Sequence, residues 1–323
     1  GADDLTETQT AAGEGERAEL DELLPQLVAQ YDEPFADSSA LPTWLLAQFA
    51  AERVKVALSG DGGDELFHGY DRYKAVAWGA TLDRLPPLRA LAGASFWQRL
   101  PGSRQRSLLR RFKRFSEAAR LEPDRRYLEW IGIFGEVRRA ELYREEVLER
   151  LPGIDPAAIN REAWRRSGRR SAVTAAANSD LQLYLPCDLM TKVDIATMAH
   201  GLECRQPFLD YRLVEQAAEL PPGLHRRWGV GKQLLRRQFA DVVPREIWRR
   251  RKQGFGAPVA EWFRGPLAGL LTDTLLAADA RSREFFREES LEQLVSEHQS
   301  GARDHGPRLW SLLWLELWLR GQA

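Results

Sequence analysis

Hydrophobic positions near the start of the chain recur at helical spacing. Between residues 18 and 31 the apolar side chains return every three or four positions, which predicts a helix that Pro25 kinks or divides. Capping residue types followed by Pro42 predict a second helix over about 41–52. Tryptophans and leucines one turn apart over 309–319 predict a buried C-terminal helix.

A short apolar run interrupts this helical pattern. Residues 54–58 are Val-Lys-Val-Ala-Leu, which predicts a buried β-strand. The run leads directly into residues 59–65, Ser-Gly-Asp-Gly-Gly-Asp-Glu, which we call the acidic glycine loop. Helix, strand, glycine-rich loop and helix in succession are typical of a doubly wound α/β sheet, in which ligands bind at the carboxyl ends of the strands.

The acidic glycine loop has a composition that suits a metal-bridged nucleotide. Glycine-rich turns after strands usually hold phosphate through backbone N–H groups. This turn has no lysine and carries three carboxylates, Asp61, Asp64 and Glu65. Carboxylates repel bare phosphate, so the pattern favours Mg²⁺ between the two. Composition alone leaves an acidic surface turn or a structural calcium loop open.

Strand signals fade after residue 80. Residues 81–170 are rich in arginine, glutamate and leucine, with prolines as punctuation, and predict helices. No internal repeat or low-complexity linker divides the chain. We therefore expect one domain over 1–323, with an α/β portion over 1–80 and a mainly helical portion over 81–323.

Composition excludes several classes of protein. Hydrophobic residues make up 44% and charged residues 29%, which argues against disorder. The formal net charge is −1, so no global field would attract nucleic acid or a membrane, and eight basic residues between Arg99 and Arg120 are expected to form a solvated helix face. Cys187 and Cys204 form no metal motif or disulfide framework, and the first residues do not have the pattern of a signal peptide. We expect a cytoplasmic location.

Four segments resemble one family. Residues 59–70, SGDGGDELFHGY, are similar to S-G-D-G-G-D-E-L-F-G-G-Y, the signature of the C-terminal synthetase domain of glutamine-hydrolysing asparagine synthetases, the asparagine synthetase B family. Residues 31–39, 188–210 and 249–255 match the same family in the same order. The resemblance covers most of residues 20–265.

This resemblance implies a fold and an activity. The fold would be a partial parallel-sheet ATP-pyrophosphatase core, similar to adenine nucleotide alpha-hydrolases, followed by a mostly helical region. The activity would need ATP and Mg²⁺: the side-chain carboxylate of aspartate attacks the α-phosphorus, and ammonia from glutamine then displaces AMP to give asparagine. Carboxylate-held Mg²⁺ would stabilise charge on the leaving pyrophosphate. A separate N-terminal glutaminase domain would supply the ammonia, and a homodimer is a further expectation.

The resemblance also assigns a nucleotide site. Leu58, Ser59 and Gly60 match positions that contact the adenosine part of ATP. Asp61, a glutamate in some relatives, would lie near the intermediate. Asp64 would be the metal carboxylate of the loop.

Three more positions match catalytic residues of the family. Tyr70 and Asp188 fall where related enzymes place a tyrosine–carboxylate pair that assists proton removal from the attacking amine. Lys252 falls where a lysine neutralises charge on the α-phosphate and pyrophosphate. Without the resemblance, a core aromatic with a hydrogen-bonded hydroxyl stays an alternative for Tyr70, whereas Asp188 would be interpreted as a helix cap and Lys252 as a surface charge. Glu203 and Arg205 are expected to form an internal ion pair.

The sequence departs from the family at two places. His68 stands where the signature has glycine. It adds bulk beside the loop, and would either alter the substrate or point outward. None of the Ser-Gly pairs in the chain, at 59, 167 and 300, belongs to the family's S-G-G-x-D-S pyrophosphate loop, and residue 1 is glycine rather than a catalytic cysteine. By comparison with the family, the chain would begin after the first strands of the sheet. We therefore expect it to be inactive, or nearly so, in isolation.

Other functions stay open. The same fold serves amidotransferases and cyclases that act on other carboxylates, and a third alternative is a non-catalytic interaction module. The intact set of acidic, tyrosine and lysine positions weighs against this third alternative. Lys232 follows Gly229-Val230-Gly231 like part of a phosphate-binding loop, but we interpret it as an exposed lysine at a helix start.

Overall fold

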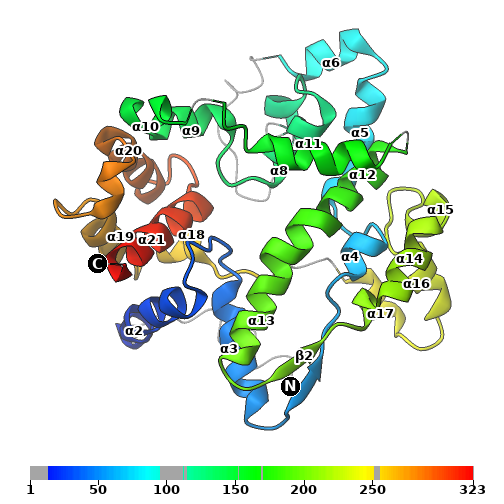
Figure 1. Ribbon diagram of the computed structural model, residues 1–323, viewed down its shortest axis with the longest axis horizontal. Helices are drawn as coiled ribbons and strands as arrows, with labels where there is room; N and C mark the ends of the chain where they lie inside the picture. The colour runs from blue at the N-terminus through cyan, green and yellow to red at the C-terminus, as the bar shows by residue number, and fades with distance from the viewer. Residues whose placement is uncertain are drawn as a thin grey trace. The chain divides into compact units, whose positions relative to one another are not determined.

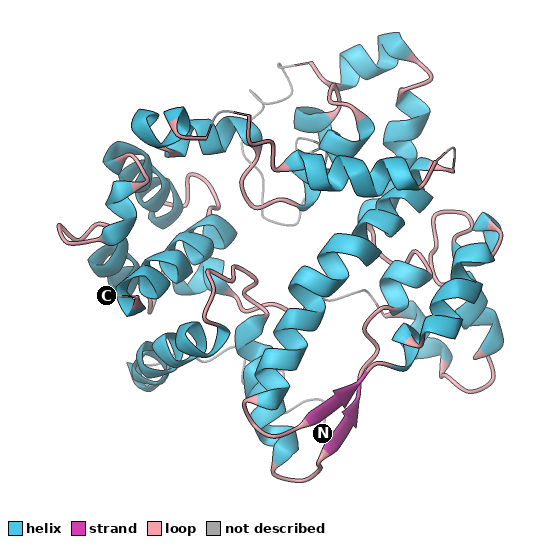
Figure 2. Ribbon diagram, viewed as in Figure 1, coloured by secondary structure: helices cyan, strands magenta, loops and turns pink. Residues whose placement is uncertain are grey.

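The computed structural model describes residues 14–94, 112, 115–151, 153–168, 170–250 and 255–322. These residues are mostly helical, with one small parallel sheet (Figure 2). None of the described helices is long and apolar enough to cross a membrane. The chain forms two compact units that alternate along the sequence. The first contains the described residues up to 45, then 133–154 and those from 255 onward, and the second contains 46–132 and 155–254.

The parallel sheet belongs to the second unit. Strand β1 (Val56–Leu58) pairs with β2 (Glu203–Arg205), so that Leu58 lies opposite Arg205 (Figure 1). A strand was predicted here, but its predicted burial is wrong, because Val56 is 41% and Leu58 74% exposed. Parallel strands are usually covered on both faces. The face that carries Val56 and Leu58 has no such cover, which leaves these side chains open, and within the described residues the sheet has only two strands.

A long continuous helix leads into β2 (Figure 1). It consists of α12 (Ala172–Ser179), the π-helix η2 (Asp180–Met190) and α13 (Thr191–Met198). Pro186 lies inside the π-helical segment, where its missing N–H removes one bond of the regular α-helical ladder. Gly201, with φ 64°, turns the chain from α13 toward β2.

A small aromatic core holds the helices of the second unit around α12. Tyr73, Val76 and Tyr127 pack with Ala176 and Ala177, which joins the helices that bear them. As predicted, prolines open two of the helices after residue 80. The remaining elements of this unit are α4 (Gly63–Leu66), α5 (Arg72–Leu82), α6 (Pro86–Ala92), α8 (Pro123–Ile131), α11 (Ala157–Arg166), η3 (Pro207–Leu209), α14 (Tyr211–Glu219), α15 (Pro222–His225), α16 (Gln233–Gln238) and α17 (Arg245–Arg249).

The first unit is built around the C-terminal helix α21 (Gly306–Gly321). This helix was predicted to be buried, and Trp310 and Trp314 are each 1% exposed. Trp314 Nε1 donates to the carbonyl oxygen of Glu33 at 3.0 Å, next to helix α2. The other elements are α2 (Glu14–Tyr31), which contains Pro25, α3 (Ala40–Ala51), which continues into the second unit, α9 (Glu136–Leu142), α10 (Glu145–Glu149), α18 (Val259–Trp262), α19 (Ala268–Leu275), η4 (Arg281–Glu284) and α20 (Glu288–Gln299).

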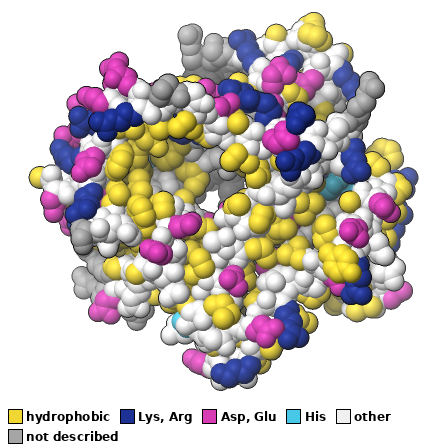
Figure 3. Space-filling model, in the orientation of Figure 1, with side chains coloured by type: hydrophobic (Ala, Val, Ile, Leu, Met, Phe, Trp, Pro, Cys, Tyr) yellow, Lys and Arg dark blue, Asp and Glu magenta, His cyan; other side chains and the backbone are white. Residues whose placement is uncertain are grey.

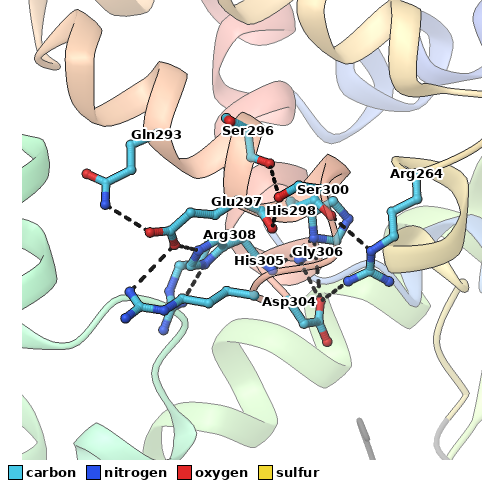
Figure 4. A network of polar contacts seen from close by, with 11 residues as sticks. Arg264, Gln293, Ser296, Glu297, His298, Ser300, Asp304, His305, Gly306 and Arg308 are labelled. Carbon is cyan, nitrogen blue, oxygen red and sulfur yellow. Dashed lines mark hydrogen bonds and ion pairs between the residues drawn. The ribbon is translucent and has the colours of Figure 1, made fainter. Parts of the chain in front are cut away.

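Two buried histidines connect α20 to the start of α21 (Figure 4). Arg308 Nη1 lies 2.9 Å from His305 Nδ1, and His305 Nε2 lies 2.7 Å from a carboxylate oxygen of Glu297. Because arginine only donates, His305 is neutral with its proton on Nε2. The backbone N–H of His305 in turn donates to His298 Nδ1 at 3.0 Å, which leaves the proton of His298 on Nε2, facing the carbonyl of Ala260 at 3.0 Å.

Charges on the molecular surface are mixed in sign. Basic and acidic side chains are interspersed over the face shown in Figure 3. Most of the segment between Arg99 and Arg120, predicted to be a solvated helix face, lies outside the described residues. Both cysteines are free thiols.

Candidate functional site

The acidic glycine loop leaves the sheet at the carboxyl end of β1, as predicted. The N–H of Ser59 donates to the carbonyl of Arg205 at 2.8 Å, so the loop starts one residue beyond the strand pairing. Ser59 Oγ donates to the carboxylate of Asp61, and the N–H of Asp61 points back to Ser59 Oγ at 3.3 Å. Leu58 is exposed immediately before this turn. These residues thus form an accessible ledge at the end of the sheet.

Two of the three glycines of the loop, Gly60 and Gly62, have different roles. Only Gly62 has a positive φ, at 85°. A Cβ at Gly62 would lie 2.2 Å from Leu209 Cδ2, so the leucine of η3 would have to shift to admit a larger residue. A Cβ at Gly60 would have nothing within 4 Å. Gly60 is therefore the position where the loop backbone is open to a ligand.

The three loop carboxylates point to three different partners. Asp61 accepts from Ser59, Asp64 Oδ1 lies 3.0 Å from the Lys232 ammonium, and Glu65 accepts from Tyr70. The side chains of Asp64 and Lys232 are 23% and 31% exposed. Lys232 does begin helix α16 as its N-cap, but its predicted exposed position is wrong, because it is half-buried against Asp64.

Gly69 makes room for this ion pair. A Cβ at residue 69 would lie 1.8 Å from Asp64 Oδ1 and 2.5 Å from Lys232 Cε. Contacts so short do not occur in proteins, so a larger residue would have to displace the pair. The glycine before Tyr70 is thus explained by the packing of two charged side chains.

Residues 225–232, which we call the strap, lie along the segment that follows the loop. His225 Nδ1 is 2.9 Å from the carbonyl oxygen of Leu66, and the N–H of Lys232 donates to the carbonyl of Phe67 at 2.8 Å. Arg226 Nη1 donates to the carbonyls of His68 and Tyr70, at 3.1 and 3.3 Å. The strap therefore satisfies backbone acceptors on almost every residue from 66 to 70.

Tyr70 and Glu65 form a buried hydrogen bond. The Tyr70 hydroxyl donates to Glu65 Oε1 at 2.5 Å, and Glu65 is 1% exposed. Burial raises the pKa of Glu65, and burial together with the neighbouring carboxylate raises the pKa of Tyr70. Tyr70 therefore keeps its proton at neutral pH and shares it with a carboxylate of raised pKa. Glu65 was identified only as one of three loop acids.

An arginine sandwiched between aromatic rings connects Tyr70 to the π-helix. The Arg72 guanidinium lies 3.8 Å from the ring centroid of Tyr70 and 4.6 Å from that of Tyr184. Asp180, 1% exposed, accepts from Arg72 Nη2 at 2.9 Å. Asp188 lies one further turn along this helix from Tyr184, whose ring packs edge-on against Tyr70 with centroids 6.2 Å apart. The predicted pairing of Asp188 with Tyr70 stays a prediction.

His68 occupies the position at which the family signature has glycine. It is 6% exposed with φ 51°, the left-handed conformation that favours glycine. Its ring stacks on His225 rather than facing outward. Burial is the largest cause that lowers the pKa of His68 to about 3, and the nearby His225 is the second. The residue is therefore a neutral packing element beneath the strap.

The fit of the loop to Mg²⁺ rests on Asp64. Among the described side chains no three His, Cys, Asp or Glu residues converge as a metal site would require. Mg²⁺ is commonly held by one or two carboxylates together with substrate phosphates. Half-buried Asp64, four residues after the open backbone of Gly60 in the same glycine-rich segment, suits that second arrangement.

Two further predictions concern charged residues. Lys252 lies outside the described residues, so its assigned role stays a prediction. Arg205 Nε does bond Glu203 Oε1 at 2.7 Å, but the side chains are 63% and 56% exposed. The predicted ion pair exists, and its predicted internal position is wrong, since both residues lie on the open sheet.

Comparison with known proteins identifies the family. The family model for asparagine synthase matches residues 6–320. The chain belongs to the asparagine synthase family. The relatives that match here are named glutamine-hydrolyzing asparagine synthetases, which confirms the family predicted from the four sequence segments.

Three relatives show how far the match to asparagine synthetases extends. A putative glutamine-hydrolyzing asparagine synthetase of Mycobacterium tuberculosis is 33% identical over 302 residues, 91% of this chain and 44% of that protein. The Bacillus subtilis asparagine synthetase 1 is 27% identical over 296 residues, with 91% and 45% covered. The Bos taurus enzyme is 31% identical over 138 residues, with 38% and 25% covered. The chain thus spans less than half the length of these relatives.

Proposed function

We propose that this chain forms the ATP-using part of an asparagine synthetase. The reaction joins ammonia to the side-chain carboxylate of aspartate through an adenylated intermediate, releasing AMP and pyrophosphate. The observation that carries the proposal is the acidic glycine loop at the carboxyl end of β1, in which the backbone of Gly60 is open and the carboxylate of Asp64 is half-buried. Membership of the asparagine synthase family supports the choice of substrates. The ATP-pyrophosphatase type of sheet, completed by more strands, is part of this proposal.

We assign the nucleotide to the ledge formed by Leu58, Ser59, Gly60 and Asp61. Exposed Leu58 offers an apolar surface to the adenosine part, and the loop backbone offers N–H donors to phosphate. Mg²⁺, when bound, would neutralise charge on the phosphates and leaving pyrophosphate. Asp64 would hold it, and Lys252 would add a second positive charge.

Tyr70 would handle the proton of the attacking amine. Its hydroxyl already donates to Glu65, and burial, which raises the pKa of this carboxyl group, makes it a better proton acceptor than an exposed glutamate. The cation–π contact with Arg72 fixes the ring. Asp188 completes the proposed group from the facing π-helix.

We propose that the chain needs other parts to turn over. Its 323 residues contain no S-G-G-x-D-S sequence and no glutaminase domain, so pyrophosphate contacts and ammonia would come from elsewhere in the protein. One domain over 1–323, a homodimer and a cytoplasmic location also stay proposals.

Two measurements test the proposal. Isothermal titration should show that the chain binds Mg-ATP, that Asp64→Asn weakens binding at least tenfold, and that Asp71→Asn, an exposed aspartate paired with Lys74, does not. Absence of Mg-ATP binding would contradict the nucleotide site. The ATP–pyrophosphate exchange assay with aspartate should give no signal from the isolated chain, and robust exchange would contradict the dependence on other parts.

A further inference from the structure

Lys232 is held over Asp64 by its backbone as well as its charge. Its N–H donates to the carbonyl of Phe67, and its φ of 56° is unusual for a lysine. A Cβ on the preceding Gly231 would lie 2.2 Å from the carbonyl oxygen of His68. The strap thus packs directly against the segment that follows Asp64. This close approach fixes the position of the Lys232 backbone.

We propose that Lys232 is a resident counter-ion that competes with a divalent cation for Asp64. This inference rests on the proposed function, which makes Asp64 the metal carboxylate. The ammonium lies 3.0 Å from Oδ1, in hydrogen-bond contact. A divalent cation on that oxygen would stand next to the ammonium, and the two positive charges repel each other strongly in a half-buried site. Lys232 must therefore leave Asp64 before a metal ion binds there.

The consequence is a loop that discourages metal binding in the absence of nucleotide. With the ammonium in place, the net charge of the pair is zero and a free divalent cation gains little. A nucleotide brings phosphate oxygens that attract both cations, so the metal enters together with its nucleotide. The pair would thus set the order in which the site is filled.

A matched pair elsewhere in the chain supplies the control. Lys74 Nζ lies 2.8 Å from Asp71 Oδ1, with side chains 49% and 64% exposed. This pair has the same chemistry and a similar distance, but both side chains are exposed at the start of α5, and neither belongs to the acidic glycine loop or the strap. Exposed pairs contribute little to the interactions around them.

The test is Mn²⁺ binding to the whole chain without nucleotide, followed by electron paramagnetic resonance and checked for folding by circular dichroism. Lys232→Met should bind Mn²⁺ about tenfold more tightly than the wild type, and Lys232→Gln, a second neutral variant, should do the same. Lys232→Arg keeps the charge and should show no gain, and neither should Lys74→Met. Adding Asp64→Asn to Lys232→Met should abolish the gain.

The outcomes separate this inference from the proposed function. Equal Mn²⁺ affinity in the wild type and both neutral variants overturns the inference, as does a gain that survives Asp64→Asn. If Asp64→Asn weakens Mg-ATP binding while the neutral Lys232 variants gain no Mn²⁺ affinity, only the inference fails. If Asp64→Asn leaves Mg-ATP binding unchanged, the assignment of Asp64 in the proposed function fails.

Discussion

The ring of His68 stacks on the ring of His225, with centroids 4.4 Å apart and planes 19° apart. His68 stands on the segment that follows the acidic glycine loop, and His225 begins the strap. Tyr73 contacts the same ring edge-on at 5.6 Å. The ring therefore fills a position between α5 and the strap, which offsets the cost of a left-handed residue where the family signature has glycine.

Replacing His68 should separate backbone strain from packing. Both His68→Gly and His68→Ala lose the buried ring, but only alanine keeps the strain at φ 51°. We expect His68→Ala to be less stable than His68→Gly by about 1 kcal/mol, measured as the free energy of unfolding in urea. At Lys74, inside helix α5, the order should reverse, because glycine destabilises helices. The same order at both positions would contradict the role given to φ.

The buried histidines should make stability depend on pH. Burial lowers the pKa of His298 and His305 in the folded chain below the value of about 6.5 expected when unfolded. At a pH between the folded and the unfolded pKa values, the unfolded chain therefore binds more protons than the folded chain. The free energy of unfolding falls as the pH decreases below about 6.5. Each such histidine contributes a slope of up to about 1.4 kcal/mol per pH unit.

The variant His305→Gln isolates one of these contributions. Glutamine can donate to Glu297 and accept from Arg308, as His305 does, but it does not titrate. Urea unfolding at pH 5.0, 6.0 and 7.5 should show a smaller loss of stability on acidification in this variant. An unchanged slope would mean that protonation of His305 is not coupled to unfolding.

Asp180 should be the most sensitive carboxylate of the second unit. It is 1% exposed and accepts from Arg72, Tyr73 and Tyr127. Asp180→Asn removes the charge that balances Arg72, and breaking buried pairs from one side costs about 3–5 kcal/mol. Asp210→Asn is the control, because Asp210 pairs with exposed Arg212 at the start of α14 and asparagine can still accept from the backbone N–H of Arg212, so its urea midpoint should move far less. Similar midpoints for both variants would contradict the role of Asp180.

The sequence predicted what depends on local pattern. The helices that became α2, α3 and α21 follow from apolar spacing and prolines, which act within one or two turns. The strand before Ser59 and the loop that follows it are a local change of pattern as well. The position of the loop at the end of a strand could therefore be inferred without knowing any partner strand.

Features that depend on distant partners could not be predicted in this way. Strand β2, Glu-Cys-Arg, has no apolar alternation and forms because residues 56–58 lie beside it. The pairing of Lys232 with Asp64 joins residues 168 positions apart, and lysine after glycines has many possible meanings. Burial of β1 failed for the opposite reason, since an apolar strand predicts a covered sheet face, and that cover comes from elements distant in sequence.

Gly60 and Gly69, which precede and follow Asp64 in the sequence, differ in the space available for a side chain. A Cβ at Gly69 would displace Asp64 and Lys232, whereas a Cβ at Gly60 would meet nothing within 4 Å. We expect Gly69→Ala to lower the free energy of unfolding by about 1–3 kcal/mol, as overpacking does, and Gly60→Ala to leave it within about 0.5 kcal/mol.

Mg-ATP titration of the same two variants should separate an effect on nucleotide binding from an effect on stability. Gly60→Ala puts a methyl group on the open backbone assigned to the nucleotide, so it should weaken binding although the fold is intact. Gly69→Ala should also weaken binding, but together with a loss of stability. If Gly60→Ala binds Mg-ATP as the wild type does, the nucleotide does not approach the loop at Gly60, and the ledge from Leu58 to Asp61 must be reassigned.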